Sequence, residues 1–193
     1  MQRKSLALLL MAVLTAQASF AARTGWKRYR NERWGFCLAY PSNWETDEGV
    51  NKAGIGIYPP QNRPDGLLSQ LSIGALPNAR SRNEAFPTLE ENFNGVQDVL
   101  RSEGATEMTI LEKRNADFLQ KPALFTKIRY KEAVSGIIWI EERINFKTQD
   151  EILYSMELKA RPEEFSELEP IFNVMVYNTF RMNCVSHSRK GRK

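Results

Sequence analysis

Three short stretches near the start of the chain alternate apolar residues with polar or small ones, which is the period of a β-strand. They are residues 35–41, 53–58 and 67–76. In the first, Phe36, Leu38 and Tyr40 share one face, so Cys37 lies off that face. Gly54 and its neighbours in the second stretch indicate that another element approaches closely. We therefore expect three strands in this part of the chain.

The apolar period then lengthens to three or four residues, as on one face of an amphipathic helix. The apolar positions are Phe86, Leu89, Phe93, Val96 and Leu100. Proline is tolerated only in the first turn of a helix, so Pro87 places the expected start close to Asn83. Gly104 provides the expected stop.

Three further alternating stretches are separated by short loops, which predicts an antiparallel meander. Each has one apolar side, which we take as the inner face. These positions are Leu124, Thr126, Ile128 and Tyr130, then Ile138, Ile140, Ile144 and Phe146, then Ile152, Tyr154, Met156 and Leu158. A strand from Met108 to Lys113 is expected to precede them.

The last apolar stripe predicts a helix that runs to about Phe180. Its members are Phe165, Leu168, Phe172, Met175, Val176 and Thr179. Pro170 interrupts it, so either the helix is kinked there or Pro170 begins a second helix. Strands, helix, meander and terminal helix together predict an α+β domain with a central antiparallel sheet.

The chain ends carry signals of their own. A positive start, nine apolar residues over 6–14 and small residues after them predict a secretory signal peptide over residues 1–21. A single domain is expected over 22–182, followed by a basic, disordered tail over 183–193. We expect the mature protein to be periplasmic or secreted, with no transmembrane segment once the signal is removed.

Charge is uneven along the chain. Of 27 basic residues, two lie in the signal and five lie from Arg181 onward, which leaves 20 against all 23 acidic residues in the body. The body is therefore net negative, and a nucleic-acid footprint across the fold is not expected.

The two cysteines predict a covalent link. Cys37 lies in the first strand, and Cys184 follows the terminal helix. Export leads to an oxidising compartment, where an even cysteine count favours pairing, so we predict a Cys37–Cys184 disulfide. The alternative is two unpaired thiols.

Catalytic and metal-binding patterns are absent from the sequence. The single histidine, His187, lies in the tail, and no cluster typical of zinc can be assembled. Glu141 and Glu142 are adjacent on a strand and point to opposite faces. Glu142 falls on the inner face, which suggests a β-bulge, a salt bridge or a functional acid. We predict no enzyme activity, no cofactor and no metal.

The other face of the meander is rich in basic and aromatic residues. Six of them form a candidate interaction face: Lys127, Arg129, Lys131, Trp139, Arg143 and Lys159. One interpretation is a solvated face with cross-strand ion pairs. The other is a docking face for an acidic protein partner.

Both ends of the body resemble PsbP-like domains, a family that includes exported DcrB-like proteins. The opening has Trp26-x-x-Tyr29-x-Asn31 and then Gly35-Phe36-x-Leu38-x-Tyr40-Pro41-x-x-Trp44. The end has Glu169-Pro170-Ile171-Phe172 and then Asn178-Thr179-Phe180-Arg181. The resemblance implies an α/β/α sandwich and a non-enzymatic role. It transfers no functional residue to this chain.

These observations favour an exported binding or accessory module of the cell envelope that binds another envelope protein through a sheet face. An envelope hydrolase is the first alternative, and it requires a deep polar cleft with two acids about 5–10 Å apart. A small-ligand carrier is the second, and it requires an enclosed apolar pocket of roughly 300 Å³ or more.

Overall fold

A computed structural model of the chain describes residues 25–48, 53–60, 69–76, 88–149 and 152–184. The predicted signal peptide and the tail from residue 185 lie outside these ranges. So does the segment around Asn83.

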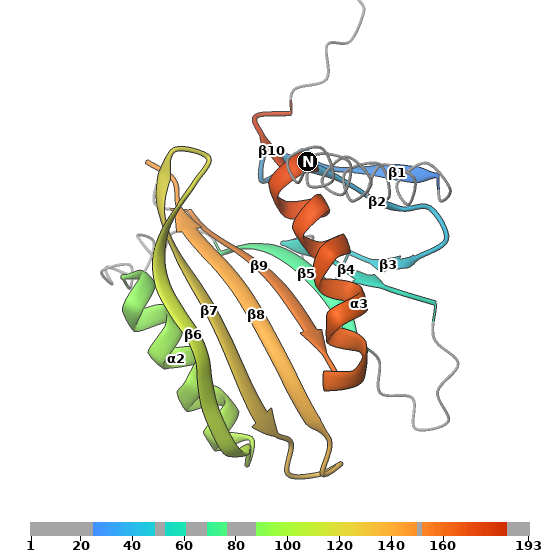
Figure 1. Cartoon of the computed structure of the whole chain (residues 1–193). Helices are drawn as coiled ribbons and strands as arrows, with labels where there is room; N and C mark the ends of the chain where they lie inside the picture. The colour runs from blue at the N-terminus through green and yellow to red at the C-terminus, as the bar shows by residue number, and fades with distance from the viewer. Residues whose placement is uncertain (1–24, 49–52, 61–68, 77–87, 150–151, 185–193) are drawn as a thin grey trace, which may run out of the picture.

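A seven-stranded sheet forms the centre of the molecule (Figure 1). Its strands, in spatial order, are β3 (Glu45–Asp47), β4 (Gly54–Tyr58), β5 (Gln70–Leu76), β9 (Leu153–Ala160), β8 (Ile138–Lys147), β7 (Lys121–Lys131) and β6 (Thr106–Phe118). Every neighbouring pair is antiparallel. The predicted meander and the strands before it are confirmed, and the strand expected from Met108 is longer at both ends.

A second, three-stranded sheet contains β1 (Trp26–Asn31), β2 (Phe36–Pro41) and β10 (Arg181–Met182), with β2 in the middle. Phe36, Leu38 and Tyr40 are buried in the main core, as their alternation predicts. The sequence pattern did not show that this strand belongs to a separate sheet.

Two kinds of contact join this small sheet to the rest of the fold. The ring of Phe36 stacks on Phe180 at 5.7 Å between centroids, and the Tyr154 hydroxyl donates to the Trp34 carbonyl at 2.6 Å. Cys37 lies off the core face and forms the predicted disulfide with Cys184. The chain end is therefore tied to the first buried strand.

Helix α2 (Leu89–Ser102) begins later than predicted. Thr88 is its N-cap and forms a capping box, in which the Glu91 amide donates to the Thr88 hydroxyl at 3.1 Å. The Thr88 backbone is extended and the helix begins at Leu89, whereas Pro87 and the expected start near Asn83 lie outside the described residues. Gly104 follows the helix with φ +88°, which confirms the predicted stop.

The terminal helix has two parts. Helix α3 (Pro162–Asn173) continues through Pro170, so a second helix does not begin there. The π-helix η3 (Val174–Thr179) follows directly, and the Phe180 amide donates five residues back to Met175 at 2.9 Å. This wider turn ends the helix at the predicted position.

The two helices lie on opposite faces of the large sheet (Figure 1). On the α3 face, Phe125, Ile144 and Met156 join the larger core. On the α2 face, Leu124 and Ile128 pack with Phe93. The predicted single inner face is therefore wrong, because buried apolar residues lie on both faces of the meander. The inner residues assigned to β7 belong to the α2 face, whereas those assigned to β8 and β9 belong to the α3 face.

Candidate functional site

A cleft lies between helix α2 and the central sheet. It has a volume of about 580 Å³, and four strands and the helix contribute to its lining. Phe93 and Leu89 of the helix pack against β7 and β8, where they contact the cluster of Leu124, Ile128 and Trp139. Towards β9 and β5, helix and sheet leave the space between them open. The cleft is therefore the part of the sheet face that α2 does not cover.

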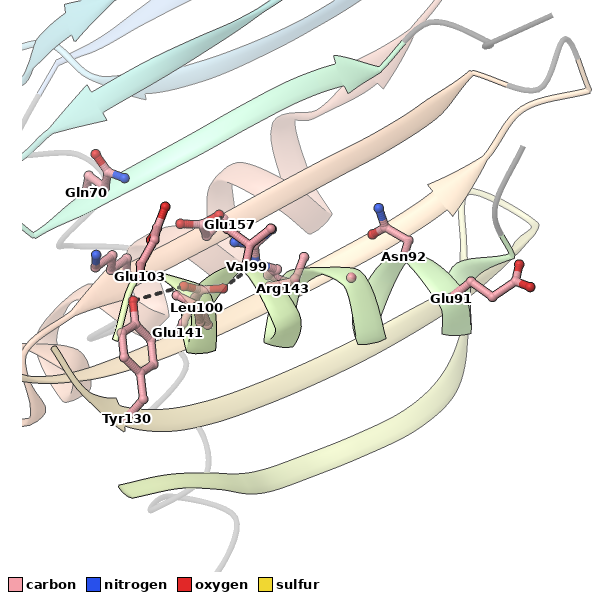
Figure 2. A pocket seen from close by; sticks show the side chains of 13 residues that line it. Gln70, Glu91, Asn92, Val99, Leu100, Glu103, Tyr130, Glu141, Arg143 and Glu157 are labelled. Carbon is pink, nitrogen blue, oxygen red and sulfur yellow. Dashed lines mark hydrogen bonds and ion pairs between the residues drawn. The ribbon is translucent and has the colours of Figure 1, made fainter. Parts of the chain in front are cut away.

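The two sides of the cleft differ in chemistry. The helix side has an apolar middle formed by Val96, Val99 and Leu100, flanked by Glu91, Asn92 and Glu103, and Val99 is 54% exposed. The sheet side is polar and charged (Figure 2). Its residues are Gln70 of β5, Tyr130 of β7, Glu141 and Arg143 of β8, and Glu157 and Lys159 of β9.

We call the charged residues on the sheet side of the cleft the charged floor, and Arg143 lies at its centre. Its Nη2 lies 2.8 Å from Oε2 of Glu157, and its Nε donates to Oε1 of Glu141. The Tyr130 hydroxyl contacts the second Glu141 oxygen at 3.4 Å (Figure 2). Antiparallel pairing sets this arrangement, because Arg143 lies opposite Glu157 in the β8–β9 register. One guanidinium thus holds two carboxylates from neighbouring strands.

Burial shifts the ionisation of these groups. It raises the pKa of Glu157 to about 7, with a further contribution from the negative charge of Glu141 and an opposing one from Arg143. Burial and the charge of Glu141 also raise the pKa of Tyr130, which stays protonated. Burial alone would lower the pKa of Arg143. The negative charges of Glu157 and Glu141 have a larger, opposite effect, so the pKa lies above its usual value. Glu157 is therefore the floor residue whose charge changes near neutral pH.

The opposite face of the sheet contains a second charged cluster. Glu142 is only 1% exposed, and its carboxylate lies 2.9 Å from Nζ of Lys127. Glu169 of α3 contacts the same ammonium at 2.7 Å, and the Phe165 ring lies 4.9 Å from it. Of the three explanations offered for Glu142, the structure shows the salt bridge. Burial raises its pKa, while Lys127 opposes that shift.

The six residues of the candidate interaction face do not share a face. Lys127 lies opposite Glu142 and Arg129 lies opposite Ile140, which places both, with Lys131, on the α3 side. Trp139, Arg143 and Lys159 lie on the α2 side. The prediction of one common surface is wrong, because alternation within each strand does not fix which side of the sheet its phases occupy.

Most of these six residues also have partners within the chain. In addition to the clusters of Lys127 and Arg143, Lys131 lies 3.6 Å from Glu107 and Lys159 lies 3.9 Å from Glu132. Trp139 is 2% exposed. These charges are neutralised internally, so they no longer argue for an acidic partner.

Two site residues were missed by sequence reasoning. Glu141 was considered only as the neighbour of Glu142, and Glu157 was not a candidate. The available signal was the pair of sequences Glu-x-Arg in β8 and Glu-x-Lys in β9, which antiparallel register brings into cross-strand contact. Only the strand register shows that these residues meet.

Within the described ranges, no three His, Cys, Asp or Glu side chains are grouped so that they could hold a metal ion. No helix in the described part of the chain combines the length and apolar composition needed to span a membrane.

Comparison with known proteins shows the fold. No protein-family model matches the sequence, and no curated protein matches it significantly. The cyanobacterial PsbP (CyanoP) of Synechocystis sp. PCC 6803 has 12% identity and a TM-score of 0.57, with 82% of this chain and 93% of that chain covered.

Two other solved structures are similar over most of their length. LpqN of Mycobacterium tuberculosis has 13% identity and a TM-score of 0.51, with 81% of this chain and 90% of that chain covered. The Ran-binding protein Mog1p of Saccharomyces cerevisiae has 11% identity and a TM-score of 0.50, with 83% and 96% covered. At these identities the likeness concerns the fold alone. The chain has the PsbP-like fold that its aromatic opening and proline-containing end predicted.

Proposed function

We propose that this chain is an exported, non-enzymatic binding or accessory module of the cell envelope, with its binding site in the cleft between α2 and the central sheet. The observation that carries the proposal is the charged floor, whose members are held by ion pairs within the chain. Arg143, Glu141 and Glu157 are fixed by one another on rigid strands. A site with fixed polar groups loses little entropy when it binds.

The chemistry of the cleft suits a protein segment. A guanidinium has five N–H donors, and the two carboxylates engage it through Nε and Nη2. The floor can therefore both donate and accept hydrogen bonds, while the exposed Val99 on the helix side offers apolar contact. A purely apolar ligand would make no hydrogen bonds with the polar groups of the floor. This argues against the small-ligand carrier, although the cleft is large enough for one.

Three observations support the cellular setting. The predicted signal peptide directs the chain out of the cytoplasm, and the Cys37–Cys184 disulfide suits an oxidising compartment. LpqN, which has the same fold, is described as involved in cell envelope biogenesis, and Mog1p as Ran-binding. We therefore expect the partner to be another envelope protein.

The test is to fill the cleft. Gly95 of α2 lines it, and a Cβ added there would meet no atom within 4 Å. Gly95→Trp should occupy the cleft without disturbing the helix. The neighbouring Asn94 is exposed and does not line the cleft, so Asn94→Trp is the matched control. We expect in vivo crosslinking in the envelope to recover a partner with the wild type and the control but not with Gly95→Trp. Equal recovery with all three would rule out the cleft as the binding site.

A hydrolase is the second candidate, and one observation favours it. The sheet side of the cleft contains two acids, and the pKa of Glu157 is raised to about 7, as suits a general acid. Against it, both acids bond the same guanidinium, and neither is left for a substrate proton. If the chain is a hydrolase, Glu157→Gln should abolish release of reducing ends from envelope glycans while the exposed Glu167→Gln leaves it intact.

A further inference from the structure

Strand β6 forms one edge of the seven-stranded sheet (Figure 1). It is 13 residues long, and only Phe118 among them is buried. Its partner is β7, and among the described residues no strand pairs with its outer side. Ile110 and Leu111 are 46% and 48% exposed. A long edge with exposed apolar residues is a template for another strand.

The two halves of β6 differ in regularity. Its register with β7 is interrupted between Thr106 and Thr109 and again between Ile110 and Glu112. Bulges of this kind hinder edge pairing. From Glu112 to Phe118, however, each residue pairs in sequence with β7. This regular half can accept a strand along seven consecutive residues.

We propose that two copies of this chain pair antiparallel through the regular half of β6, with the two-fold axis at Asn115. In such an isologous interface, each residue before Asn115 lies opposite one equally far after it on the other copy. Lys113 then faces Asp117 of the partner subunit, and just beyond the paired residues Leu111 approaches Leu119 of the partner subunit. Both contacts occur twice.

The surroundings of these residues fit the pairing. Asp117 has no ion-pair partner in the described part of its own chain. Lys113 is held in place on the α2 side, by an ion pair with Glu90 and by the Phe93 ring 5.0 Å away. Leu119 is 38% exposed in the tight turn after β6, where Leu119 and Gln120 both have positive φ. Two exposed leucines and one unpaired acid would thus gain partners together.

Other registers are less favourable. An axis at Glu112, Lys113 or Arg114 would place that charged residue opposite its own copy, and like charges directly opposite are destabilising. An axis at Ala116 avoids this repulsion, but it opposes Asn115 with Asp117 and forms no ion pair. The sequence of β6 therefore favours a two-fold axis at Asn115 over the other positions.

A cysteine on the axis tests the register. Cys37 and Cys184 are bridged, so Asn115→Cys introduces the single free thiol. Directly opposed residues have Cα atoms about 4.5–5.5 Å apart, which is within reach of a disulfide. Glu112→Cys is the control, because its two copies would lie about 20 Å apart along the strands. Non-reducing electrophoresis of the exported protein under mild oxidation should show a covalent dimer for Asn115→Cys only. No dimer, or equal dimer at both positions, would overturn the proposal.

A charge exchange tests the contacts without crosslinking. By analytical ultracentrifugation, Asp117→Lys should weaken dimerisation about tenfold, because both Lys113–Asp117 pairs become repulsive. Adding Lys113→Asp should restore it by reversing both charges. A wild type that sediments as a monomer at all concentrations tested, or an exchange variant no better than Asp117→Lys, would contradict the proposed interface.

Discussion

The two faces of the central sheet contain similar charged clusters in different surroundings. On the α3 face, Glu142 is buried against Lys127 beneath α3 and its aromatic residues. On the α2 face, Glu141 and Glu157 share Arg143, and an open cleft lies above them. The side chain of Glu157 is 13% exposed, whereas that of Glu142 is 2% exposed. On the α3 face Glu142 is covered, and we call this the sealed cluster after that residue, although Glu169 at its rim is 35% exposed. The α2 cluster opens into the cleft.

The covering elements explain the difference. The α3 face is covered by α3, η3 and the small sheet, whose aromatic residues meet around Phe180. The α2 face is covered by one helix, α2, which packs over β7 and β8. Because Glu142 is shielded from water, losing its cation should cost stability. Changes in the open cluster should act mainly on ionisation and binding.

The largest effect is expected from the disulfide that secures the α3 side. Replacing Cys37 and Cys184 with alanine removes a link across 147 residues of sequence. Chain-entropy reasoning gives a loss of up to about 5 kcal/mol in the free energy of unfolding. Urea denaturation measures it. Partner recovery through the α2 cleft should be unchanged in the folded variant. A loss below about 1 kcal/mol would show that the chain end is held mainly by packing.

The next largest effect is expected inside the sealed cluster. Lys127→Met leaves the Glu142 carboxylate buried without its cation, which should destabilise the fold by about 4 kcal/mol in urea denaturation. Lys127 is not a free surface residue, because its side chain is 18% exposed and paired twice.

A double substitution provides the control. Lys127→Met combined with Glu142→Leu removes both charges and should recover most of the lost stability. If the double variant is no more stable than Lys127→Met, the ion pair is not the source of the loss and the packing of the Lys127 side chain is.

The sequence predicted single elements well and their relation in space poorly. The alternation of Phe36, Leu38 and Tyr40 identified β2, and Gly104 marked the end of α2, because both signals are local. The interaction face failed at Lys127 and Arg143, which alternation placed together and register places on opposite sides. Buried apolar residues lie on both faces of this sheet, so the pattern within one strand does not show which side each phase occupies. Only the cross-strand pairing then shows which residues meet.

A smaller effect is expected from the open cluster, and it depends on pH. The pKa of Glu157 is raised from 4.5 to about 7 in the folded state. Between those values the folded chain holds a proton that the unfolded chain has lost, so stability falls as pH rises through this window. The decrease is on the order of 3 kcal/mol and levels off above pH 7. Urea denaturation from pH 4.5 to 8 should show a shallower decrease in Glu157→Gln.

A matched variant separates Glu157 from other titrating groups. The buried Glu142 has a raised pKa as well and contributes a slope of the same sign. The difference in unfolding free energy between wild type and Glu157→Gln isolates the contribution of Glu157. Glu167 is exposed, so Glu167→Gln should show the same pH dependence as the wild type. Parallel curves for wild type and Glu157→Gln would mean that Arg143 keeps Glu157 ionised throughout the range.

The smallest effect is expected at Gly95, on the helix side of the cleft. Glycine in the middle of a helix costs about 1 kcal/mol relative to alanine, and an added Cβ meets nothing within 4 Å. Gly95→Ala should therefore stabilise the protein by up to that amount in urea denaturation. Asn94→Ala, on the exposed side of the same turn, should gain about half as much. If Gly95→Ala stabilises the fold yet weakens partner recovery, the glycine keeps the α2 face open for a ligand. If it instead lowers stability, the helix is more closely packed over the sheet at this point than the open cleft implies.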